Sequence, residues 1–258
     1  MTVRHKLTAL VLGTVDYGEA DRVVSLLTRE RGKLSAFARG ARASRRRFAG
    51  LLEPFTLVAV EVRERRDSEL PALESASALR GHGAIRSDLA RIGCAAYACE
   101  LARELVRDHE PHVDLFDLLS AYLALLDAVP ATPAALRAFE LGALRAAGIG
   151  PRLDGCACCG GELGVGRERL RFDPGQGGIL CPRCSARAGP VGRELGRGAA
   201  RALGRLQAGG LEAALAVRLA PGEAAEARAA LAAFIEHYLG RRLKARRFLD
   251  EMGPALGG

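Results

Sequence analysis

The chain has 258 residues, of which 49% are hydrophobic. This length and composition allow one large domain or two to three small ones with real cores, and they exclude a disordered tail protein. The formal net charge is +8, but 35 of the 38 basic residues are Arg and Ala, Leu and Gly are abundant, a bias that indicates GC-rich coding. Total charge alone is therefore weak evidence for a nucleic-acid partner.

The first residues contain only a brief apolar run without a small-residue cleavage site, and no stretch approaches the roughly 20 apolar residues that cross a bilayer. We therefore expect a soluble, cytoplasmic protein with no membrane partner. The charge distribution is a better guide than the total. Net charge is +5 over residues 1–80, −3 over 81–150, +2 over 151–192 and +4 over 193–258, so the positive charge is concentrated at the two ends.

Residues 1–80 are expected to form a β domain. Five short runs rich in Val, Leu, Thr and Phe are separated by turn residues. Five strands in about 75 residues, with a longer connection between the third and fourth, match a barrel of the OB type, and an SH3-like barrel is the alternative. The predicted strands cover residues 6–13, 22–29, 33–39, 55–65 and 69–79.

The connection between the third and fourth strands is the first candidate nucleic-acid site. Residues 39–52 read RGARASRRRFAGLL, with five arginines and no acid. Such a density repels itself unless it is solvated or faces an anion, and loops that flank the strands of OB barrels bind single strands. A merely solubilising loop is the alternative. Phe37 and Phe48 are candidate stacking residues, although burial in the barrel is the favoured interpretation. The candidate phosphate ligands are Arg39, Arg42, Arg45, Arg46 and Arg47.

Residues 81–152 change to helical spacing and form the first part of a predicted helical domain. We expect one long helix from about residue 84 to Asp108 and two more at about 113–128 and 133–147. Thr132 can cap the last of these, because it precedes a proline that suits the first turn.

Residues 153–190 contain the strongest motif. It consists of one Cys-x-x-Cys pair, Cys156 and Cys159, followed by a second pair, Cys181 and Cys184. Two Cys-x-x-Cys steps across a short hairpin can place four thiolates at the corners of a tetrahedron, which is the closed coordination of structural zinc. A disulfide or a redox pair is the alternative, but seven Cys in a chain without a secretory signal favour metal. We expect one structural Zn²⁺ per chain, no metal catalysis, and no ligand role for Cys158.

Residues 191–258 are expected to complete the helical domain, with helices at about 193–208 and 222–248. The last helix carries the run RRLKARR. A solvated helix end is the alternative to a DNA contact here, since cations complement the negative end of a helix dipole. The candidate DNA contacts in this run are Arg241, Arg242 and Lys244.

Motifs for catalysis are missing from the sequence. It contains no Walker A loop, no strand-linked GxGxxG, no HExxH and no GxSxG elbow, so we do not expect an enzyme. The predicted architecture is α+β: an N-terminal five-stranded OB-fold barrel followed by an α-helical domain with an inserted four-cysteine zinc module.

This order of basic barrel, helices, four-cysteine module and returning helices resembles the RecO family of bacterial DNA repair proteins. The stretches that carry the resemblance are LVLGTVDYGEADRVVSLLTRERGKLSAFARGARASRRRFAG and GRRLKARRFLDEM. The resemblance covers nearly the whole chain. It implies a nucleoid-associated recombination mediator that binds single- and double-stranded DNA, anneals complementary strands, engages the single-strand-binding protein and, with RecR, helps load RecA.

Two other classes remain open at this point. One is a zinc-ribbon DNA-binding transcription regulator, and the other is a nucleic-acid enzyme whose site is assembled from scattered acidic residues. Strand annealing without added nucleotide or divalent metal would favour the mediator over both.

Overall fold

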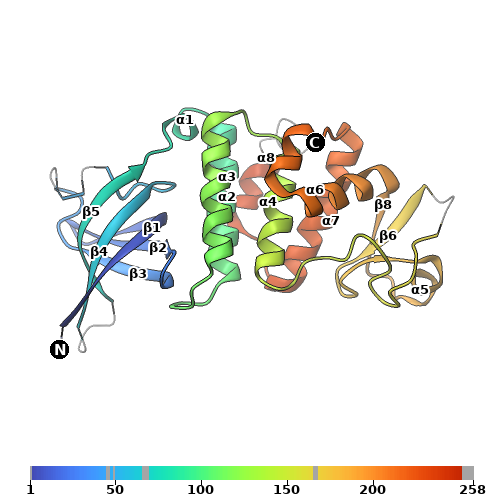
Figure 1. The fold of residues 1–258 in the computed structure, drawn as a ribbon, viewed down its shortest axis with the longest axis horizontal. Helices are drawn as coiled ribbons and strands as arrows, with labels where there is room; N and C mark the ends of the chain where they lie inside the picture. Colours follow the sequence, from blue (N-terminus) through green and yellow to red (C-terminus); the bar gives the residue numbers. More distant parts are fainter. Residues whose placement is uncertain (1, 45–46, 49, 66–69, 165–167, 252–258) are drawn as a thin grey trace. The chain divides into compact units, whose positions relative to one another are not determined.

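The computed structural model describes residues 2–44, 47–48, 50–65, 70–164 and 168–251 (Figure 1). The chain divides into two compact units, residues 1–129 and 130–258. Within the described residues, the first unit holds a β-barrel and helices α1 to α3, and the second holds a three-stranded sheet and helices α4 to α8. Among the residues that the structure describes, no helix combines the length and the hydropathy needed to cross a bilayer.

The first unit begins with a closed barrel of strand order β1-β2-β3-β5-β4. All neighbouring strands pair antiparallel except β3 and β5, which pair parallel at Phe37 and Ala72. This is the OB-type Greek-key barrel that the sequence predicts. The strands are β1 (Thr2–Tyr17), β2 (Asp21–Thr28), β3 (Gly32–Ala38), β4 (Leu57–Arg65) and β5 (Ala72–Arg80).

Strand β1 is about twice as long as predicted, because it serves two neighbours. Its first half, Thr2 to Leu10, pairs with β4, and its second half, Ala9 to Tyr17, pairs with β2. The register shifts between Val11 and Gly13, a bulge that lets the strand bend from one neighbour to the other. The segment around Asp16 and Tyr17 therefore belongs to the strand, beyond its predicted end at residue 13.

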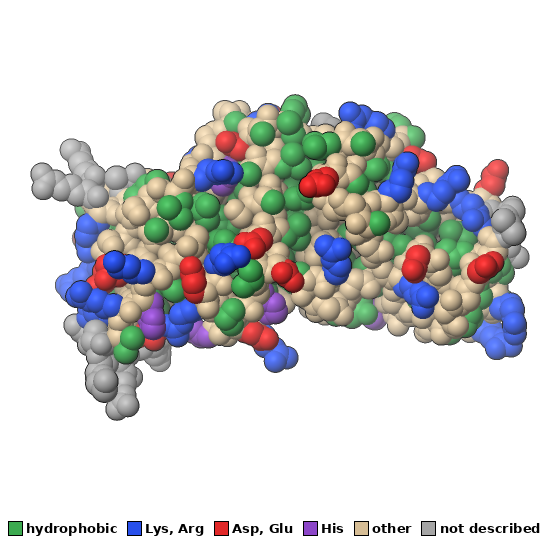
Figure 2. All heavy atoms as spheres, viewed as in Figure 1, with side chains coloured by type: hydrophobic (Ala, Val, Ile, Leu, Met, Phe, Trp, Pro, Cys, Tyr) green, Lys and Arg blue, Asp and Glu red, His purple; other side chains and the backbone are tan. Residues whose placement is uncertain are grey.

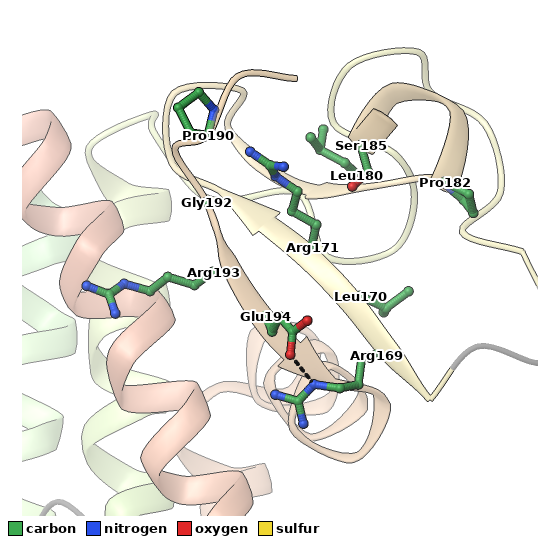
Figure 3. Close-up of a pocket in the computed structure, with 10 residues that line it drawn as sticks. All are labelled: Arg169, Leu170, Arg171, Leu180, Pro182, Ser185, Pro190, Gly192, Arg193 and Glu194. Carbon is green, nitrogen blue, oxygen red and sulfur yellow. Dashed lines mark hydrogen bonds and ion pairs between the residues drawn. The ribbon is translucent and has the colours of Figure 1, made fainter. Parts of the chain in front are cut away.

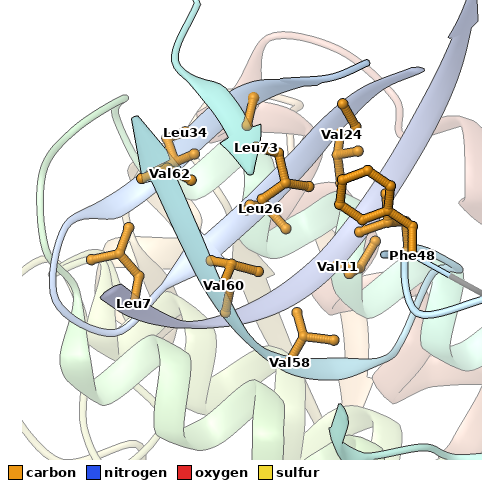
Figure 4. Packing of buried hydrophobic residues seen from close by; sticks show 14 of the residues in the cluster. Leu7, Val11, Val24, Leu26, Leu34, Phe48, Val58, Val60, Val62 and Leu73 are labelled. Carbon is orange, nitrogen blue, oxygen red and sulfur yellow. The ribbon is translucent and has the colours of Figure 1, made fainter. Parts of the chain in front are cut away.

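The barrel core explains how the arginine-rich connection is anchored. Phe48 is 1% exposed and lies inside the barrel beside Val11 and Val24 (Figure 4). Leu52, from the same connection, is also buried in this cluster. Burying side chains of this size stabilises a fold by about 1.5–3 kcal/mol each. Phe48 is therefore a core residue and is not available to stack on a base.

Three helices complete the first unit: α1 (Gly83–Arg86), α2 (Leu89–Leu105) and α3 (Val113–Ala128). The prediction of one long helix from residue 84 to Asp108 is wrong. Asp88 adopts an extended backbone and its carboxylate accepts a hydrogen bond from the Arg91 N–H at 3.0 Å, so it caps a new helix instead of continuing the old one.

The α2–α3 connection contacts the barrel at the turn between β2 and β3. The Lys33 carbonyl accepts a hydrogen bond from the His109 N–H at 2.8 Å, and Lys33 Nζ lies 3.2 Å from the Asp108 carboxylate. Gly32 has φ +69°, and a Cβ at this position would lie 1.9 Å from the Glu110 carbonyl oxygen. A glycine is therefore required where the two backbones meet.

The second unit is built on α4 (Pro133–Ala146), α6 (Arg197–Ala216) and α7 (Pro221–Leu239). Helix α4 begins as predicted, because the Thr132 hydroxyl accepts a hydrogen bond from the Ala135 N–H at 3.2 Å. Helix α6 is kinked at Gly210, whose backbone is not helical.

Two predictions for this unit are wrong. The helix predicted from residue 193 begins only at Arg197, because residues 193–196 form strand β8 (Arg193–Gly196) and pair with β6 (Arg169–Asp173). The helix predicted at 222–248 is interrupted at Gly240, whose left-handed backbone ends α7 before α8 (Lys244–Glu251) begins.

Candidate metal centre and nucleic-acid interface

The four cysteines that the sequence predicts as metal ligands lie close together. The Sγ atoms of Cys156, Cys159, Cys181 and Cys184 all lie within 4.8 Å of one another. The Cys159 and Cys181 Sγ atoms are 3.8 Å apart. A tetrahedral ion with bonds of about 2.3 Å to sulfur needs its ligands about 3.8 Å apart, so the donor set fits one zinc ion. Cys158 is exposed and does not belong to this group.

Local backbone geometry positions the first cysteine pair. The Gly160 N–H donates to the Cys156 carbonyl at 2.9 Å, and the Cys156 N–H donates to the Gly161 carbonyl at 2.8 Å. Gly160 has φ +75°, a conformation that glycine adopts without strain. The chain thus turns back tightly after Cys159.

The second pair follows the predicted hairpin of β6 and β7 (Gly178–Leu180). Cys181 comes directly after β7, and α5 (Pro182–Arg187) begins at the next residue. The Ser185 N–H donates to the Cys181 carbonyl at 2.8 Å, which closes the turn that carries Cys184.

Hydrogen bonds from the hairpin hold the first pair against the second. The Ala157 N–H donates to the Ile179 carbonyl at 2.7 Å, and the Ile179 N–H donates to the Arg152 carbonyl at 3.0 Å. Gly178 has φ +150°, and a Cβ there would lie 2.3 Å from the Arg152 carbonyl oxygen. The backbone thus brings the two cysteine pairs together through contacts that only a glycine permits.

The thiols differ in acidity. Burial opposes ionisation of Cys156, but hydrogen bonds from the backbone N–H groups of Cys181, Cys159 and Cys158 outweigh it and lower the pKa of the Cys156 thiol to about 6. Hydrogen bonding with Cys181 raises the pKa of the Cys184 thiol. Because like charges repel, four adjacent thiolates require a cation between them.

The arginine-rich loop is the second candidate site. Arg39, Arg42 and Arg47 are exposed, whereas Arg45 and Arg46 lie outside the described residues. Arg47 Nη2 donates to the Arg39 carbonyl at 2.7 Å, and its guanidinium carbon lies 5.0 Å from the centre of the Phe48 ring. Figure 2 shows Lys and Arg side chains over the barrel. The loop is therefore held by its own backbone and by the buried Phe48.

Arg42 links this loop to the β1–β2 turn. Its Nη1 donates to the Gly18 carbonyl at 3.3 Å, and its Nε lies 3.5 Å from the Asp16 carboxylate. Tyr17 is an exposed aromatic residue at the end of β1, beyond the strand predicted at residues 6–13, and its ring contacts Phe37. Val15 and Tyr17 are two residues apart, so in a strand their side chains point to the same face. This spacing is the signal that could have identified Tyr17 as part of an apolar strand face.

The C-terminal basic run spans the connection from α7 to α8 and the first turn of α8, and does not lie at the end of one long helix. Arg241, Arg242 and Lys244 are exposed, and Lys244 is the first residue of α8. Arg242 lies 3.6 Å from the Glu236 carboxylate and also pairs with Asp250. Part of the positive charge of this run is therefore neutralised within the chain.

A pocket of about 290 Å³ lies beside the cysteine module, between β6, β8 and the segment around Gly192 (Figure 3). Arg171 Nη2 donates to the carbonyls of Gly189 and Val191, and Arg169 Nε donates to Glu194 at 2.6 Å. These arginines stabilise the segment around the pocket, and the lining contains no nucleophile paired with a base.

A closed five-stranded OB barrel followed by helices and a four-cysteine module defines the chain as an OB-barrel protein with a candidate metal centre. Family models described as Recombination protein O N terminal and Recombination protein O C terminal match residues 1–82 and 86–247. The chain therefore belongs to the RecO family of DNA repair proteins. This confirms the resemblance found in the sequence.

Three relatives named DNA repair protein RecO match the chain over nearly its whole length and theirs. The chain is 66% identical over 257 residues to the DNA repair protein RecO of Anaeromyxobacter sp. (strain Fw109-5), with 100% of both chains covered. It is 49% identical to that of Myxococcus xanthus (strain DK1622), with 97% and 98% covered. It is 36% identical to that of Symbiobacterium thermophilum, also with 97% and 98% covered. All three relatives are bacterial.

Proposed function

We propose that the protein is a recombination mediator of the bacterial cytoplasm, associated with the nucleoid. It binds single- and double-stranded DNA, anneals complementary strands without hydrolysing a nucleotide, and with RecR helps load RecA on DNA coated by the single-strand-binding protein. The observation that carries this proposal is the exposed arginine-rich loop on an OB barrel, in a chain whose relatives are named DNA repair proteins.

The loop supplies phosphate contacts that do not depend on sequence. Exposed guanidinium groups attract a phosphate backbone and release its counterions, which is the main source of non-specific affinity for nucleic acid. Arg39, Arg42 and Arg47 are exposed, and Arg45 and Arg46 belong to the same run of the sequence. The second unit offers a second basic surface at Arg241, Arg242 and Lys244. Two cationic surfaces on one protein lower the repulsion between two phosphate backbones, which favours annealing.

The four-cysteine centre holds one structural Zn²⁺ in this proposal. Cys156, Cys159, Cys181 and Cys184 would supply all four ligands, and no coordination position remains for water or substrate. The ion would join the first cysteine pair to the hairpin, so its binding energy contributes to the folding of the second unit. Its role is to stabilise, and the chain's own backbone hydrogen bonds orient the ligands.

Functions divide along the chain. We assign DNA binding to the barrel at residues 1–80, a helical domain to residues 81–152 and 191–258, and a zinc module to residues 153–190. The single-strand-binding protein and RecR are the direct partners, and RecA is an indirect one. An acidic segment of a partner would be attracted to the same cationic surfaces that attract DNA.

Strand annealing tests the proposal. Complementary oligonucleotides are coated with the cognate single-strand-binding protein, and duplex formation is followed after addition of this protein without ATP. We expect faster annealing than in its absence, and slower annealing by a variant in which Arg39, Arg42 and Arg47 are changed to Ala. If the protein gives no acceleration at any stoichiometry, the mediator proposal fails and a zinc-ribbon transcription regulator becomes the better explanation.

A further inference from the structure

The outer face of β1, β2 and β3 carries an apolar row, which is exposed on β1 and half-buried on β2 and β3. Val15 is paired with Val23, and Val23 is paired with Phe37, so the three side chains lie side by side on one face of the sheet. Tyr17 follows Val15 by two residues and projects from the same face. Val15 is 68% exposed and Tyr17 is 62% exposed, whereas Val24 and Ala36 on the opposite face are fully buried.

The two aromatic residues of this row contact each other edge to face. The ring centres of Tyr17 and Phe37 are 5.6 Å apart and the ring planes are inclined by 81°. This geometry is favourable in itself, and it leaves most of the Tyr17 ring in contact with solvent. Phe37 is fixed in place, because its N–H donates to the Pro71 carbonyl at 2.8 Å and its backbone pairs with Ala72 where the barrel closes.

The arginine-rich loop borders the aromatic end of the row, where Arg42 also pairs with Asp16, the residue before Tyr17. The arginine-rich loop leaves β3 two residues after Phe37. The loop returns to the β1–β2 turn beside Tyr17, where the Gly40 N–H donates to the Asp21 carboxylate at 2.6 Å and the Arg42 N–H donates to the Ala20 carbonyl at 3.0 Å. An aromatic surface and a cationic loop therefore meet at one end of the barrel.

We propose that Tyr17 and Phe37 form a stacking platform for the unpaired bases of single-stranded nucleic acid, with the phosphates held by the arginine-rich loop. An apolar row with an exposed Tyr17 ring, bordered by the arginine-rich loop, matches a single strand, which presents the flat apolar faces of its bases together with a charged backbone. A duplex presents its backbone and the edges of its bases but not their faces, because the faces are already stacked on one another inside. The platform therefore selects single strands, whereas the loop alone binds both forms. This inference rests on the proposed function and adds the residues that distinguish the two DNA forms.

Binding of single-stranded and double-stranded oligonucleotides by Tyr17→Leu and Phe37→Leu variants tests the platform. Since one base–aromatic stack contributes about 1–3 kcal/mol, each variant is expected to bind oligo-dT at least about 5-fold more weakly. Affinity for duplex and the dependence of affinity on salt should change little, because the arginines remain. Two matched controls are Tyr17→Phe, which keeps the ring, and Leu79→Ala, which removes another exposed apolar side chain (53% exposed) from the same barrel. Both should bind as the unchanged protein does.

Tyrosine fluorescence gives a readout that altered folding would not imitate. The chain has four Tyr and no Trp, and Tyr97 and Tyr122 are fully buried. Stacking of bases on Tyr17 should quench part of the tyrosine emission when oligo-dT binds. Tyr17→Phe should bind oligo-dT with unchanged affinity but lose that quenching, whereas Tyr238→Phe should keep it.

Three outcomes would overturn the platform. Folded Leu variants could bind oligo-dT as tightly as the unchanged protein, or they could lose single-strand and duplex affinity equally. They could also keep all DNA affinity and lose binding to a protein partner, which would make the apolar row a protein-docking surface. Absence of all DNA binding by the unchanged protein is a different result, because it contradicts the proposed function itself.

Discussion

Gly32 shows how a single residue joins the barrel to the helices of the first unit. Its left-handed backbone would be strained in any other residue, and an added Cβ would clash with the Glu110 carbonyl oxygen at 1.9 Å. We predict that Gly32→Ala lowers the free energy of unfolding by clearly more than the roughly 1–2 kcal/mol cost of the left-handed conformation. Denaturant unfolding measures this change.

Gly18→Ala is the matched control for this prediction. Gly18 has φ +60°, but nothing lies within 4 Å of the position of its Cβ. Its replacement should therefore cost only the conformational term. Equal destabilisation of the two variants would contradict the close approach between Gly32 and Glu110.

The proposed metal ligands can be distinguished from Cys158 by substitution. The structure brings together Cys156, Cys159, Cys181 and Cys184 and leaves Cys158 exposed beside them. We predict that Cys158→Ser retains one equivalent of zinc, whereas the double variant Cys181→Ser, Cys184→Ser does not bind it, because two thiolates cannot complete a tetrahedral site. Elemental analysis of the folded proteins decides the matter, and zinc retained by the double variant would refute the ligand assignment.

The proposed binding of phosphates by the arginine-rich loop is measurable as a dependence of DNA affinity on salt. Each Ala substitution at Arg39, Arg42 or Arg47 that removes a phosphate interaction should flatten the dependence of log affinity on log salt by roughly 0.7 for a single strand. Arg4→Ala is the matched control, since it removes one charge from the same barrel at an exposed side chain paired with Glu74. An unchanged slope in the triple Ala variant, with the fold intact, would show that the loop is only a solvated surface.

Features that depend on residues close together in the sequence were predictable. The burial or exposure of a side chain, where it depends on residues distant in the sequence, was not. The spacing of the four cysteines is a local pattern, and so is the Thr132 cap. The burial of Phe48 and the exposure of Tyr17 depend on how the barrel closes. Composition gives no signal for that closure.

At the scale of elements, the strands of the barrel were predicted well because alternation and turn residues mark them. The errors fall where tertiary contacts override helical propensity. Strand β8 exists because Leu195 pairs with Leu170, 25 residues away in the chain. The helical run after residue 222 is divided because Gly240 takes a left-handed conformation and α8 is held by other contacts.

Helix α8 is held by a buried network of charged side chains around Glu140. The Glu140 carboxylate lies 2.7 Å from Arg137 Nε and 3.7 Å from Arg246 Nη1, and Arg246 Nε also lies 3.1 Å from the Asp250 carboxylate. Glu140, Arg137 and Arg246 are buried. The network therefore attaches α8, and with it the C-terminal basic run, to α4.

We predict that Glu140→Ala lowers the free energy of unfolding by about 3–5 kcal/mol, because it removes a buried counter-charge from the buried guanidinium groups of Arg137 and Arg246. Arg242→Ala, which breaks an exposed ion pair with Asp250, should cost only about 0–1 kcal/mol. Denaturant unfolding of both variants measures the difference. Destabilisation of the same size in both would contradict the role of the network in holding α8.

At the scale of the whole molecule, the two compact units contain different sites. The arginine-rich loop and the aromatic row belong to the first unit, and the four-cysteine centre belongs to the second. Of these sites, the four-cysteine cluster is the one that the sequence predicted and the structure brings together. The grouping of α1, α2 and α3 with the barrel depends on contacts such as that of Lys33 with His109, which no local pattern encodes.

Metal removal should therefore affect the two units unequally. Zinc binding is coupled to the folding of its site, so a strong chelator should destabilise the segment from Arg152 to Gly196, where the two cysteine pairs, the hairpin and β8 lie. We predict faster amide hydrogen exchange across this segment and unchanged protection in β1 to β5. Binding of oligo-dT should persist after chelation, because Arg39, Arg42, Arg47, Tyr17 and Phe37 all belong to the first unit.

Hydrogen exchange and an oligo-dT titration on the same chelated sample check both parts of this prediction. The double variant Cys181→Ser, Cys184→Ser should reproduce the exchange pattern without a chelator, and Cys158→Ser should resemble the unchanged protein. An equal decrease of protection in the barrel would show that the two units fold as one, so that zinc supports the DNA-binding surface as well. Unchanged exchange in the cysteine module after complete metal removal would show that the backbone contacts of Gly178 and Ile179 suffice to hold the four thiols together.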